Sequence, residues 1–142
     1  MKKILYIWKD AYPWDVRVQK VCESLVGNNY DVHLLSRYKH GLSKTEIINN
    51  INVYRVGYKL PSILTQPLQG NPVWDNAIEF YIRKIKPDLL IVREILLAVS
   101  VGRFAKKYGI PVVMDMAEHY PAAMRDFKKY NSNFFLRFAV HK

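Results

Sequence analysis

The chain has 142 residues, with 22 Lys and Arg against 12 Asp and Glu and a formal net charge of +10. This length suits one domain whose core is large enough to fold without disulfides, and the single cysteine, Cys22, excludes an internal disulfide. A hydrophobic fraction of 50% excludes wholesale disorder. No apolar run is long enough to span a membrane, and the N-terminal one ends at Lys9, too early for a signal peptide, which predicts a cytoplasmic protein.

Three segments of the first half are rich in strand-forming residues and predict β-strands: 3–8, 31–36 and 51–56. A helix is predicted between the first two, because Asp15 is a typical N-cap residue and apolar side chains recur at helical spacing from Val18 to Leu25. Gly27 is typical of its end. The polar segment 37–50 shows no clear pattern.

In the second half, helices alternate with strands after a long predicted loop. The segment 57–71 contains two prolines and shows no periodicity, and loops of this length are usually functional or mobile. Asn71 followed by Pro72 is typical of a helix start, and the apolar run 88–92 is the pattern of a parallel strand covered on both faces. The remaining pattern predicts a helix at 97–108, a strand at 112–116 and a helix that opens at Pro121.

This alternation predicts a doubly wound α/β fold. We expect a Rossmann-like, mainly parallel sheet of about five strands with helices on both faces, in a single domain over residues 1–142. No internal repeat or interdomain linker is apparent. Ligands of such sheets bind at the carboxyl ends of the strands.

The first loop of a doubly wound sheet usually carries the signature of its ligand. Here the loop at 9–14 has no glycine, which excludes the Gly-x-Gly-x-x-Gly dinucleotide turn, and the chain has no Gly-x4-Gly-Lys-Ser/Thr phosphate loop. It has no Cys-x2-Cys pair and its four histidines are scattered, so no metal site is predicted. A Gly-x-Ser-x-Gly nucleophile elbow is also absent.

Polar and aromatic side chains collect where three predicted strands end, and the carboxyl ends of parallel strands meet at one edge. After the first strand come Tyr12, Trp14, Asp15 and Arg17, after the fourth Arg93 and Glu94, and after the fifth Asp115, Glu118 and His119. Aromatic faces stack on sugar rings, carboxylates accept hydrogen bonds from hydroxyls, and arginine forks bind phosphate. This mixture predicts a site for a polyhydroxylated or phosphorylated ligand.

Each of these residues also has a purely structural interpretation. Asp15 suits a helix cap, and Arg93 with Glu94 suits a local ion pair. Glu118 precedes a predicted helix, whose N-terminus favours negative charge. Asp115, inside a strand, favours a structural role as a hydrogen-bonding partner.

Seven segments, in their order along the chain, resemble family 4 glycosyltransferases. Six of them are 2–7 (KKILYI), 13–20 (PWDVRVQK), 24–35 (SLVGNNYDVHLL), 51–56 (INVYRV), 86–92 (KPDLLIV) and 109–115 (GIPVVMD). The seventh, 114–121 (MDMAEHYP), resembles the family's Asp-x-His-Glu-x-x-Pro loop. It departs from that pattern, since Ala117 stands in the place of the usual histidine and His119 follows Glu118. The first loop also lacks the glycine pair that many members place beside the donor diphosphate.

The resemblance implies the N-terminal, acceptor-side half of a GT-B fold, in which two Rossmann-like domains flank the active site. The whole enzyme is expected to transfer a sugar from a nucleotide-sugar to a glycan or lipid-linked acceptor, with retention, in cell-surface polysaccharide biosynthesis. Glu118 and His119 are then the candidate catalytic residues. The candidate substrate-binding residues are Tyr12, Trp14, Asp15, Arg17, Arg93 and Glu94. No metal or other cofactor is implied, and without the donor-binding domain the chain is expected to catalyse little.

The positive charge, spread over both halves of the chain, has several interpretations. It suits nucleic acid, an anionic membrane surface or phosphorylated ligands, or it serves solubility alone. Basic and aromatic residues at 125–142 suit either the inner face of the plasma membrane or a contact with the second GT-B domain. An alternative function is a non-catalytic, flavodoxin-like module that binds an anionic partner, protein or nucleic acid, of which nucleic acid is the less favoured. A third is a stand-alone regulator that binds a partner protein.

Overall fold

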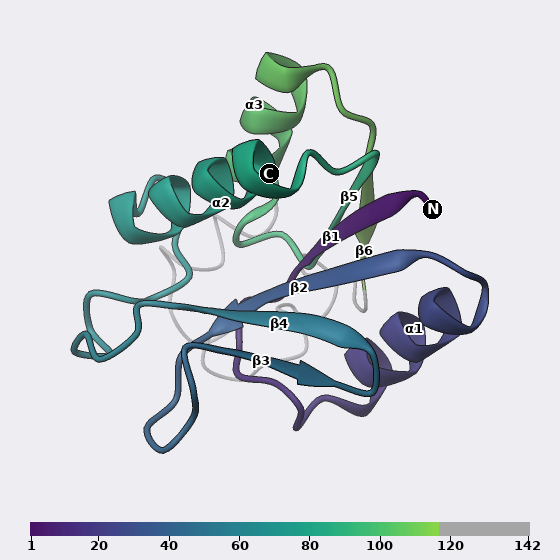
Figure 1. Cartoon of the computed structure of the whole chain (residues 1–142). Coiled ribbons are helices and arrows are strands. Elements are labelled where there is room, and N and C mark those ends of the chain that lie inside the picture. Colours follow the sequence, from purple (N-terminus) through teal and green to yellow (C-terminus); the bar gives the residue numbers. More distant parts are fainter. Residues whose placement is uncertain (117–142) are drawn as a thin grey trace, which may run out of the picture.

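The computed structural model describes residues 1–116, which form one sheet with helices on both sides (Figure 1). The elements in chain order are β1 (Lys3–Ile7), α1 (Val16–Gly27), β2 (Asp31–Arg37), β3 (Thr45–Ile48), β4 (Ile51–Val56), α2 (Pro72–Ile85), β5 (Leu89–Arg93), α3 (Ala98–Tyr108) and β6 (Val112–Asp115). The strand order is β3-β4-β2-β1-β5-β6, and every neighbouring pair is parallel except β3 with β4. The predicted Rossmann-like α/β fold is thus confirmed. The predicted helix at Pro121, the candidates Glu118 and His119, and the segment 125–142 lie outside the described residues.

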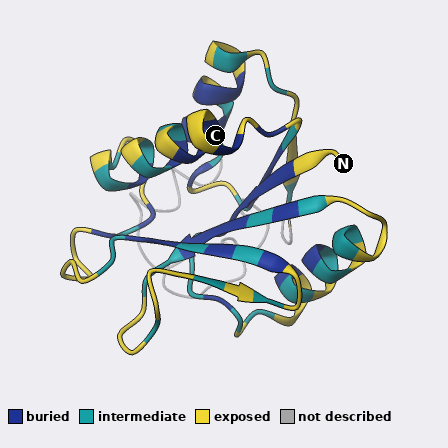
Figure 2. Ribbon diagram, in the orientation of Figure 1, coloured by how far each residue is buried: buried dark blue, intermediate teal, exposed yellow. Residues whose placement is uncertain are grey.

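Alternate side chains of the central strands supply two separate cores. Leu5 and Ile7 of β1 point to the side covered by α2 and α3, whereas Ile4 and Tyr6 point to the side covered by α1. This alternation follows from the two-residue period of a strand. Burial of each such side chain contributes roughly 1.5–3 kcal/mol, so both faces of β1 stabilise the sheet. Figure 2 shows the buried residues concentrated in the middle of the sheet and on the inner faces of the helices.

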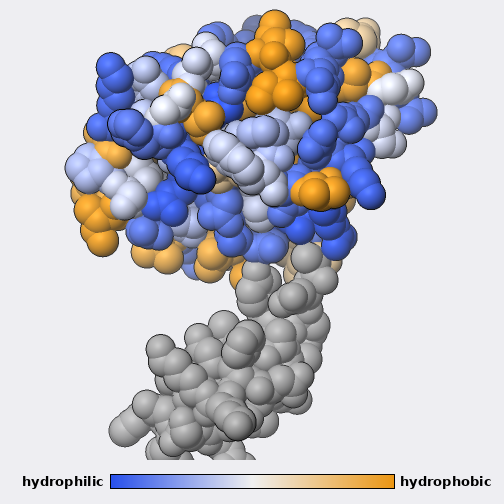
Figure 3. Space-filling model, turned by 90° about the horizontal axis from the view of Figure 1, so that it is seen from below, coloured by the Kyte–Doolittle hydropathy of each residue, from blue (hydrophilic) through white to orange (hydrophobic). Residues whose placement is uncertain are grey.

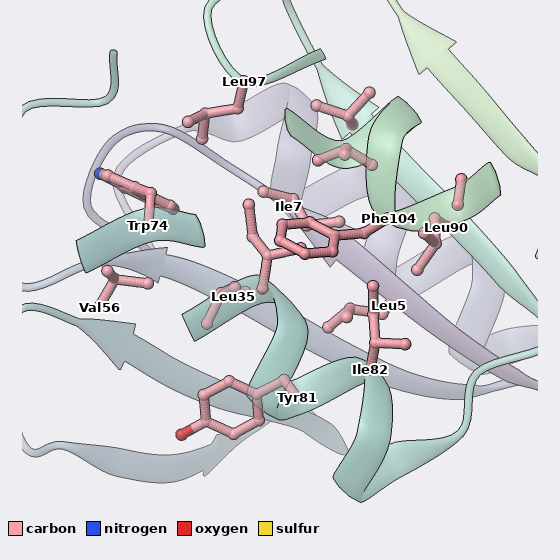
Figure 4. Packing of buried hydrophobic residues seen from close by; sticks show 14 of the residues in the cluster. Leu5, Ile7, Leu35, Val56, Trp74, Tyr81, Ile82, Leu90, Leu97 and Phe104 are labelled. Carbon is pink, nitrogen blue, oxygen red and sulfur yellow. The ribbon is translucent and has the colours of Figure 1, made fainter. Parts of the chain in front are cut away.

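β5 is covered on both faces, as its continuous apolar run predicts. Leu90 and Val92 belong to the core under α2 and α3, and Ile91 belongs to the core under α1. In Figure 4, Phe104 of α3 lies over Leu5 and Ile7 of β1, within a group of aliphatic side chains from the sheet and both helices. β6, by contrast, is an edge strand with exposed apolar side chains.

The sheet has a sixth strand that the sequence did not predict. β3 pairs antiparallel with β4 through a tight turn at Asn49 and Asn50, both with positive φ (50° and 62°), the backbone that a two-residue hairpin turn requires. β3 lies at the sheet edge, and Ile47 is 72% exposed, so the strand lacks the buried apolar face that marks strands in a sequence. A partly buried ion pair from Arg55 to Glu46 holds it to β4.

The helix caps appear where the sequence placed them. The Asp15 carboxylate accepts a hydrogen bond from the Val18 amide at 2.8 Å, and the Asn71 side chain accepts one from the Val73 amide at 2.9 Å. The Asn71 amide group also donates to the carbonyls of Leu64 and Gln66, at 3.0 and 2.8 Å. Asn71 therefore begins α2 and anchors the end of the preceding loop.

We expect Asn71→Ala to lower the free energy of unfolding by at least about 1 kcal/mol, because it removes a helix cap together with two bonds to the loop. Asn76→Ala is the matched control, since Asn76 is exposed on the same helix and alanine favours helix. Urea unfolding followed by circular dichroism measures both variants. Equal stabilities of the two variants would contradict the assigned role of Asn71.

Candidate functional site

The carboxyl ends of β1, β5 and β6 meet the start of α1 in a cluster of charged side chains. Parallel pairing places Arg93, the last residue of β5, opposite Asp115, the last residue of β6. The loop after β1 returns Asp15 and Arg17 to the same edge at the start of α1. Glu94 follows Arg93 at this edge, with its carboxylate 4.0 Å from Arg93 Nε. We call Asp15, Arg17, Arg93, Glu94 and Asp115 the rim cluster.

Asp115 joins the three elements of the rim cluster to each other. Its carboxylate accepts a hydrogen bond from the Tyr6 hydroxyl at 2.9 Å and one from Arg17 Nη2 at 2.7 Å. Arg93 Nη1 lies 3.8 Å from its Oδ2 atom. Burial of Tyr6, and then its bond to Asp115, raise the pKa of that hydroxyl far above its ordinary value, so it remains a proton donor. Asp115 therefore has the structural role that its position in a strand predicts.

Arg93 is a buried cation whose hydrogen-bonding capacity is only partly used. Its side chain is 7% exposed, and its Nε and Nη1 atoms form no hydrogen bond within residues 1–116. Besides Asp115, the nearest carboxylate oxygens belong to Asp15 at 3.7 Å and Glu94 at 4.0 Å, beyond hydrogen-bond distance. The guanidinium carbon lies 5.0 Å from the centre of the Trp8 ring, which adds a cation–π contact. The arrangement leaves two buried guanidinium nitrogens without a hydrogen-bond acceptor among the described residues, although three carboxylates lie within 4.0 Å of the group.

Glu94 connects the rim cluster to the first loop. Lys9 Nζ lies 2.9 Å from Asp10 Oδ2 and 3.5 Å from Glu94 Oε2. Burial opposes the charge on Lys9, but the two carboxylates outweigh it and raise the Lys9 pKa above its ordinary value. Glu94 has a φ of +67°, a left-handed backbone that costs an L-residue about 1–2 kcal/mol. Such backbone strain is often found at functional sites.

Four of the six predicted substrate-binding residues thus lie together: Asp15, Arg17, Arg93 and Glu94. Tyr12 does not join them, because its ring is fully buried in the core under α1, and burial raises its pKa to about 12. The prediction placed Tyr12 among the ligand-binding residues of the first loop, but its ring lies in the core instead. Trp14 is 58% exposed, and Lys39 Nζ lies 4.4 Å from its ring centre.

A second site lies beside the rim cluster, at the ends of β2 and β4. No binding residue was predicted there, although the loop 57–71 after β4 has a length that is often functional. The loops after β2 and β4 project from the same side of the sheet, at the left in Figure 1, and contribute to a cavity of about 770 Å³. Its lining residues are Asp10, Ala11, Arg37, Tyr38, Lys39, His40, Lys59, Leu60, Ser62, Thr65 and Gln66. We call this cavity the basic pocket. The rule that ligands bind at strand ends, applied to β2 and β4 as well, could have found it.

Neither a cluster of metal ligands nor a membrane-spanning helix is found in the described part of the chain. Residues 1–116 contain no group of three His, Cys, Asp or Glu side chains arranged to bind a metal ion. Among the helices of that same region, none has the length and apolar character to cross a membrane. The face shown in Figure 3 is mostly hydrophilic, and its apolar side chains lie in separate patches.

Comparison with solved structures relates the fold to that of sucrose-phosphate synthase. No protein-family model matches the chain, and no curated protein is found as a relative. A structure of sucrose-phosphate synthase from Thermosynechococcus elongatus matches 99% of the chain with a TM-score of 0.73 and 14% sequence identity. A second structure of that enzyme matches 87% of the chain, with a TM-score of 0.63 and 12% identity, and the match covers 68% of it. The chain spans only 39% of the first structure's length. At these identities the likeness establishes the fold.

We expect Asp115→Asn to lower the free energy of unfolding by about 1–3 kcal/mol, because it removes the charged partner of Arg17 and leaves buried Arg93 with less neutralising charge. The control is Asp75→Asn, where the carboxylate pairs with an exposed Arg103 and a loss below about 1 kcal/mol is expected. Chemical denaturation at pH 7 compares the two variants. If Asp115→Asn were no more destabilising than its control, Asp115 would not be what holds the rim cluster together.

Proposed function

We propose that the chain is the N-terminal, acceptor-side domain of a glycosyltransferase of the GT-B fold. The whole enzyme transfers a sugar from a nucleotide-sugar to a glycan or lipid-linked acceptor, with retention, in cell-surface polysaccharide biosynthesis at the cytoplasmic side of the membrane. The observation that carries the proposal is the buried, incompletely paired guanidinium of Arg93 at the carboxyl ends of the strands. Support comes from the fold, which is shared with sucrose-phosphate synthase, a GT-B glycosyltransferase.

In this proposal the rim cluster positions the acceptor. Arg93 and Arg17 donate hydrogen bonds to ligand oxygens, while Asp15 and Glu94 accept bonds from sugar hydroxyls. Holding the acceptor hydroxyl beside the donor converts a collision between two substrates into a step within one complex, which is a large part of the rate gain available to a transferase.

The chemical step needs no nucleophile from the protein in this mechanism. The nucleoside diphosphate leaves from the sugar carbon, and fixed donors stabilise the charges as they separate. Glu118 and His119 are proposed, from the family resemblance, to contact the reacting sugar. The donor is a substrate held mainly by a second domain, and no metal or further cofactor takes part in the proposal.

The basic pocket and the net charge of +10 favour a second candidate, a non-catalytic module that binds an anionic partner. Salt dependence distinguishes the two. Binding to a phosphate backbone falls steeply between low and moderate salt, whereas binding of a neutral carbohydrate hardly changes. Binding that survives high salt and is lost in Trp14→Ala would favour the carbohydrate-binding domain.

The experiment that tests the proposal begins with the source gene. We expect the reading frame to continue past the codon for Lys142 into a second Rossmann-like domain with a Glu-x7-Glu segment. The full gene product is then assayed for transfer from a panel of radiolabelled nucleotide-sugars to membrane and oligosaccharide acceptors. Absence of a second domain, or of transfer from every donor in the panel, would overturn the catalytic proposal.

In that assay Arg93→Ala is expected to lower kcat/KM by roughly 100-fold or more, since a buried donor set at the reacting centre is lost. Arg17→Ala, at a half-exposed position, is a second variant that leaves the core intact. Arg103→Ala is the matched control, because Arg103 lies on α3 in an exposed ion pair with Asp75. Full activity of the folded Arg93 and Arg17 variants would remove the rim cluster from the mechanism.

A further inference from the structure

The basic pocket concentrates positive charge that nothing in the described structure neutralises. Arg37, Lys39, His40 and Lys59 line it, against the single carboxylate of Asp10. Asp10 is already paired with Lys9 at 2.9 Å. Within residues 1–116, none of Lys39, His40 and Lys59 forms an ion pair with a carboxylate. A pocket with several cations and one carboxylate, itself already paired, attracts anions. The low dielectric of its walls strengthens the electrostatic potential that acts on a ligand.

The wall of the pocket is built around one buried residue, Thr65, which is 2% exposed. Its carbonyl accepts a bond from Trp74 Nε1 at 3.0 Å, and its hydroxyl accepts one from Arg37 Nε at 3.2 Å. Gly57 (φ +72°) approaches it so closely that an added Cβ would lie 2.1 Å from the Thr65 methyl carbon. These contacts tie the loop after β4 to α2 and to the end of β2. The pocket is therefore a formed site and not a gap between loose loops.

Arg37 and Lys59 are held in the pocket wall by a hydrogen bond and by an unusual backbone conformation, respectively. Arg37 Nη2 donates to the Ser62 carbonyl at 2.7 Å, which fixes the guanidinium in the wall while other N–H groups remain. Lys59 has a φ of +61°, a backbone conformation that glycine or asparagine adopts at less cost. This conformation costs an L-residue about 1–2 kcal/mol, and such backbone strain is often found at functional sites.

Trp14 adds an apolar face next to these cations. Its exposed ring lies 4.4 Å from Lys39 Nζ, and Lys39 lines the pocket. A flat aromatic surface beside a group of cations suits a ligand that has both a sugar ring and a phosphate. The pocket also adjoins the rim cluster, because Lys9 contacts both Asp10 in the pocket wall and Glu94.

We infer that the basic pocket binds a phosphate group, held by Lys39, His40 and Lys59, with the attached sugar against Trp14. The assignment of this phosphate to the acceptor rests on the proposed function, whereas the binding itself does not. The phosphate can belong to a soluble sugar phosphate or to a lipid headgroup. Both present anionic phosphate oxygens, so the experiment separates the two sources.

The test uses the 142-residue chain and two kinds of probe. Isothermal titration calorimetry and ¹H–¹⁵N NMR compare glucose 6-phosphate with glucose. Flotation compares vesicles of phosphatidylcholine containing phosphatidic acid with phosphatidylcholine alone. We expect at least one phosphate-bearing probe to bind about tenfold or more tighter than its phosphate-free counterpart, as charge-assisted bonds to a phosphate require. With glucose 6-phosphate, the shifted amide signals should be those of His40, Gly41 and Lys59.

The double variant Lys39→Ala/Lys59→Ala is expected to lose about tenfold or more of that affinity. The control Lys20→Ala/Lys106→Ala removes the same charge from exposed positions on α1 and α3 and should change affinity less than about twofold. A loss confined to the soluble probe or to the vesicles supports the pocket and identifies the source of the phosphate. Equal losses in both double variants, or no preference for phosphate in either arm, would overturn the inference. Neither readout involves sugar transfer. The inference can therefore fail while the proposed function stands, and the proposed function can fail while the inference stands.

Discussion

The carboxylate of Asp115 is the constraint on which the carboxyl edge of the sheet depends. It lies at the last residue of β6 and contacts Tyr6 of β1 and Arg17 of α1, with Arg93 of β5 within 4 Å. One side chain thus joins β6 to residues that lie 98 and 109 positions earlier in the sequence. Because the strands are parallel, their carboxyl ends share an edge, and a single acid can pair with two arginines there.

The same edge contains a second region, which has excess positive charge and is held in place by different contacts. In the rim cluster, carboxylates from Asp15, Glu94 and Asp115 surround Arg93. In the basic pocket, the cations outnumber the single acid, and Thr65 fixes the wall through bonds to Arg37 and Trp74. The first region is nearly balanced in charge, whereas the second is not. This contrast favours hydroxyl recognition in the cluster and phosphate recognition in the pocket.

In the proposed acceptor-side domain, the two regions would bind different parts of the same ligand. Lys9 bridges them through Asp10 and Glu94, so a ligand of the size of a sugar phosphate placed against Trp14 has the rim cluster as its neighbour. Trp8, whose ring contacts the Arg93 guanidinium, is buried in the core under α1. Charges beside such a buried apolar core interact more strongly than charges in water.

Local patterns in the sequence were sufficient for the fold class, because helix caps and strand faces depend on neighbours a few residues away. Asp15 and Asn71 cap helices as predicted, and the apolar run in β5 is buried on both faces. The sequence by itself also placed Arg93 and Glu94 at the functional edge, since strand order and parallel direction follow from the alternation of elements. β3 escaped prediction because an exposed edge strand has no buried stripe to reveal it.

Only the tertiary structure decided how these residues are used. Tyr12 lies in the core because of residues from α1 and the sheet, which no local pattern contains. The environment of Arg93 comes from Trp8, Asp15 and Asp115, on three other segments of the chain. The basic pocket is assembled from loops after three different strands. Secondary structure depends on neighbours along the chain, whereas burial and electrostatic fields depend on neighbours in space. Only the tertiary fold brings residues from distant segments together.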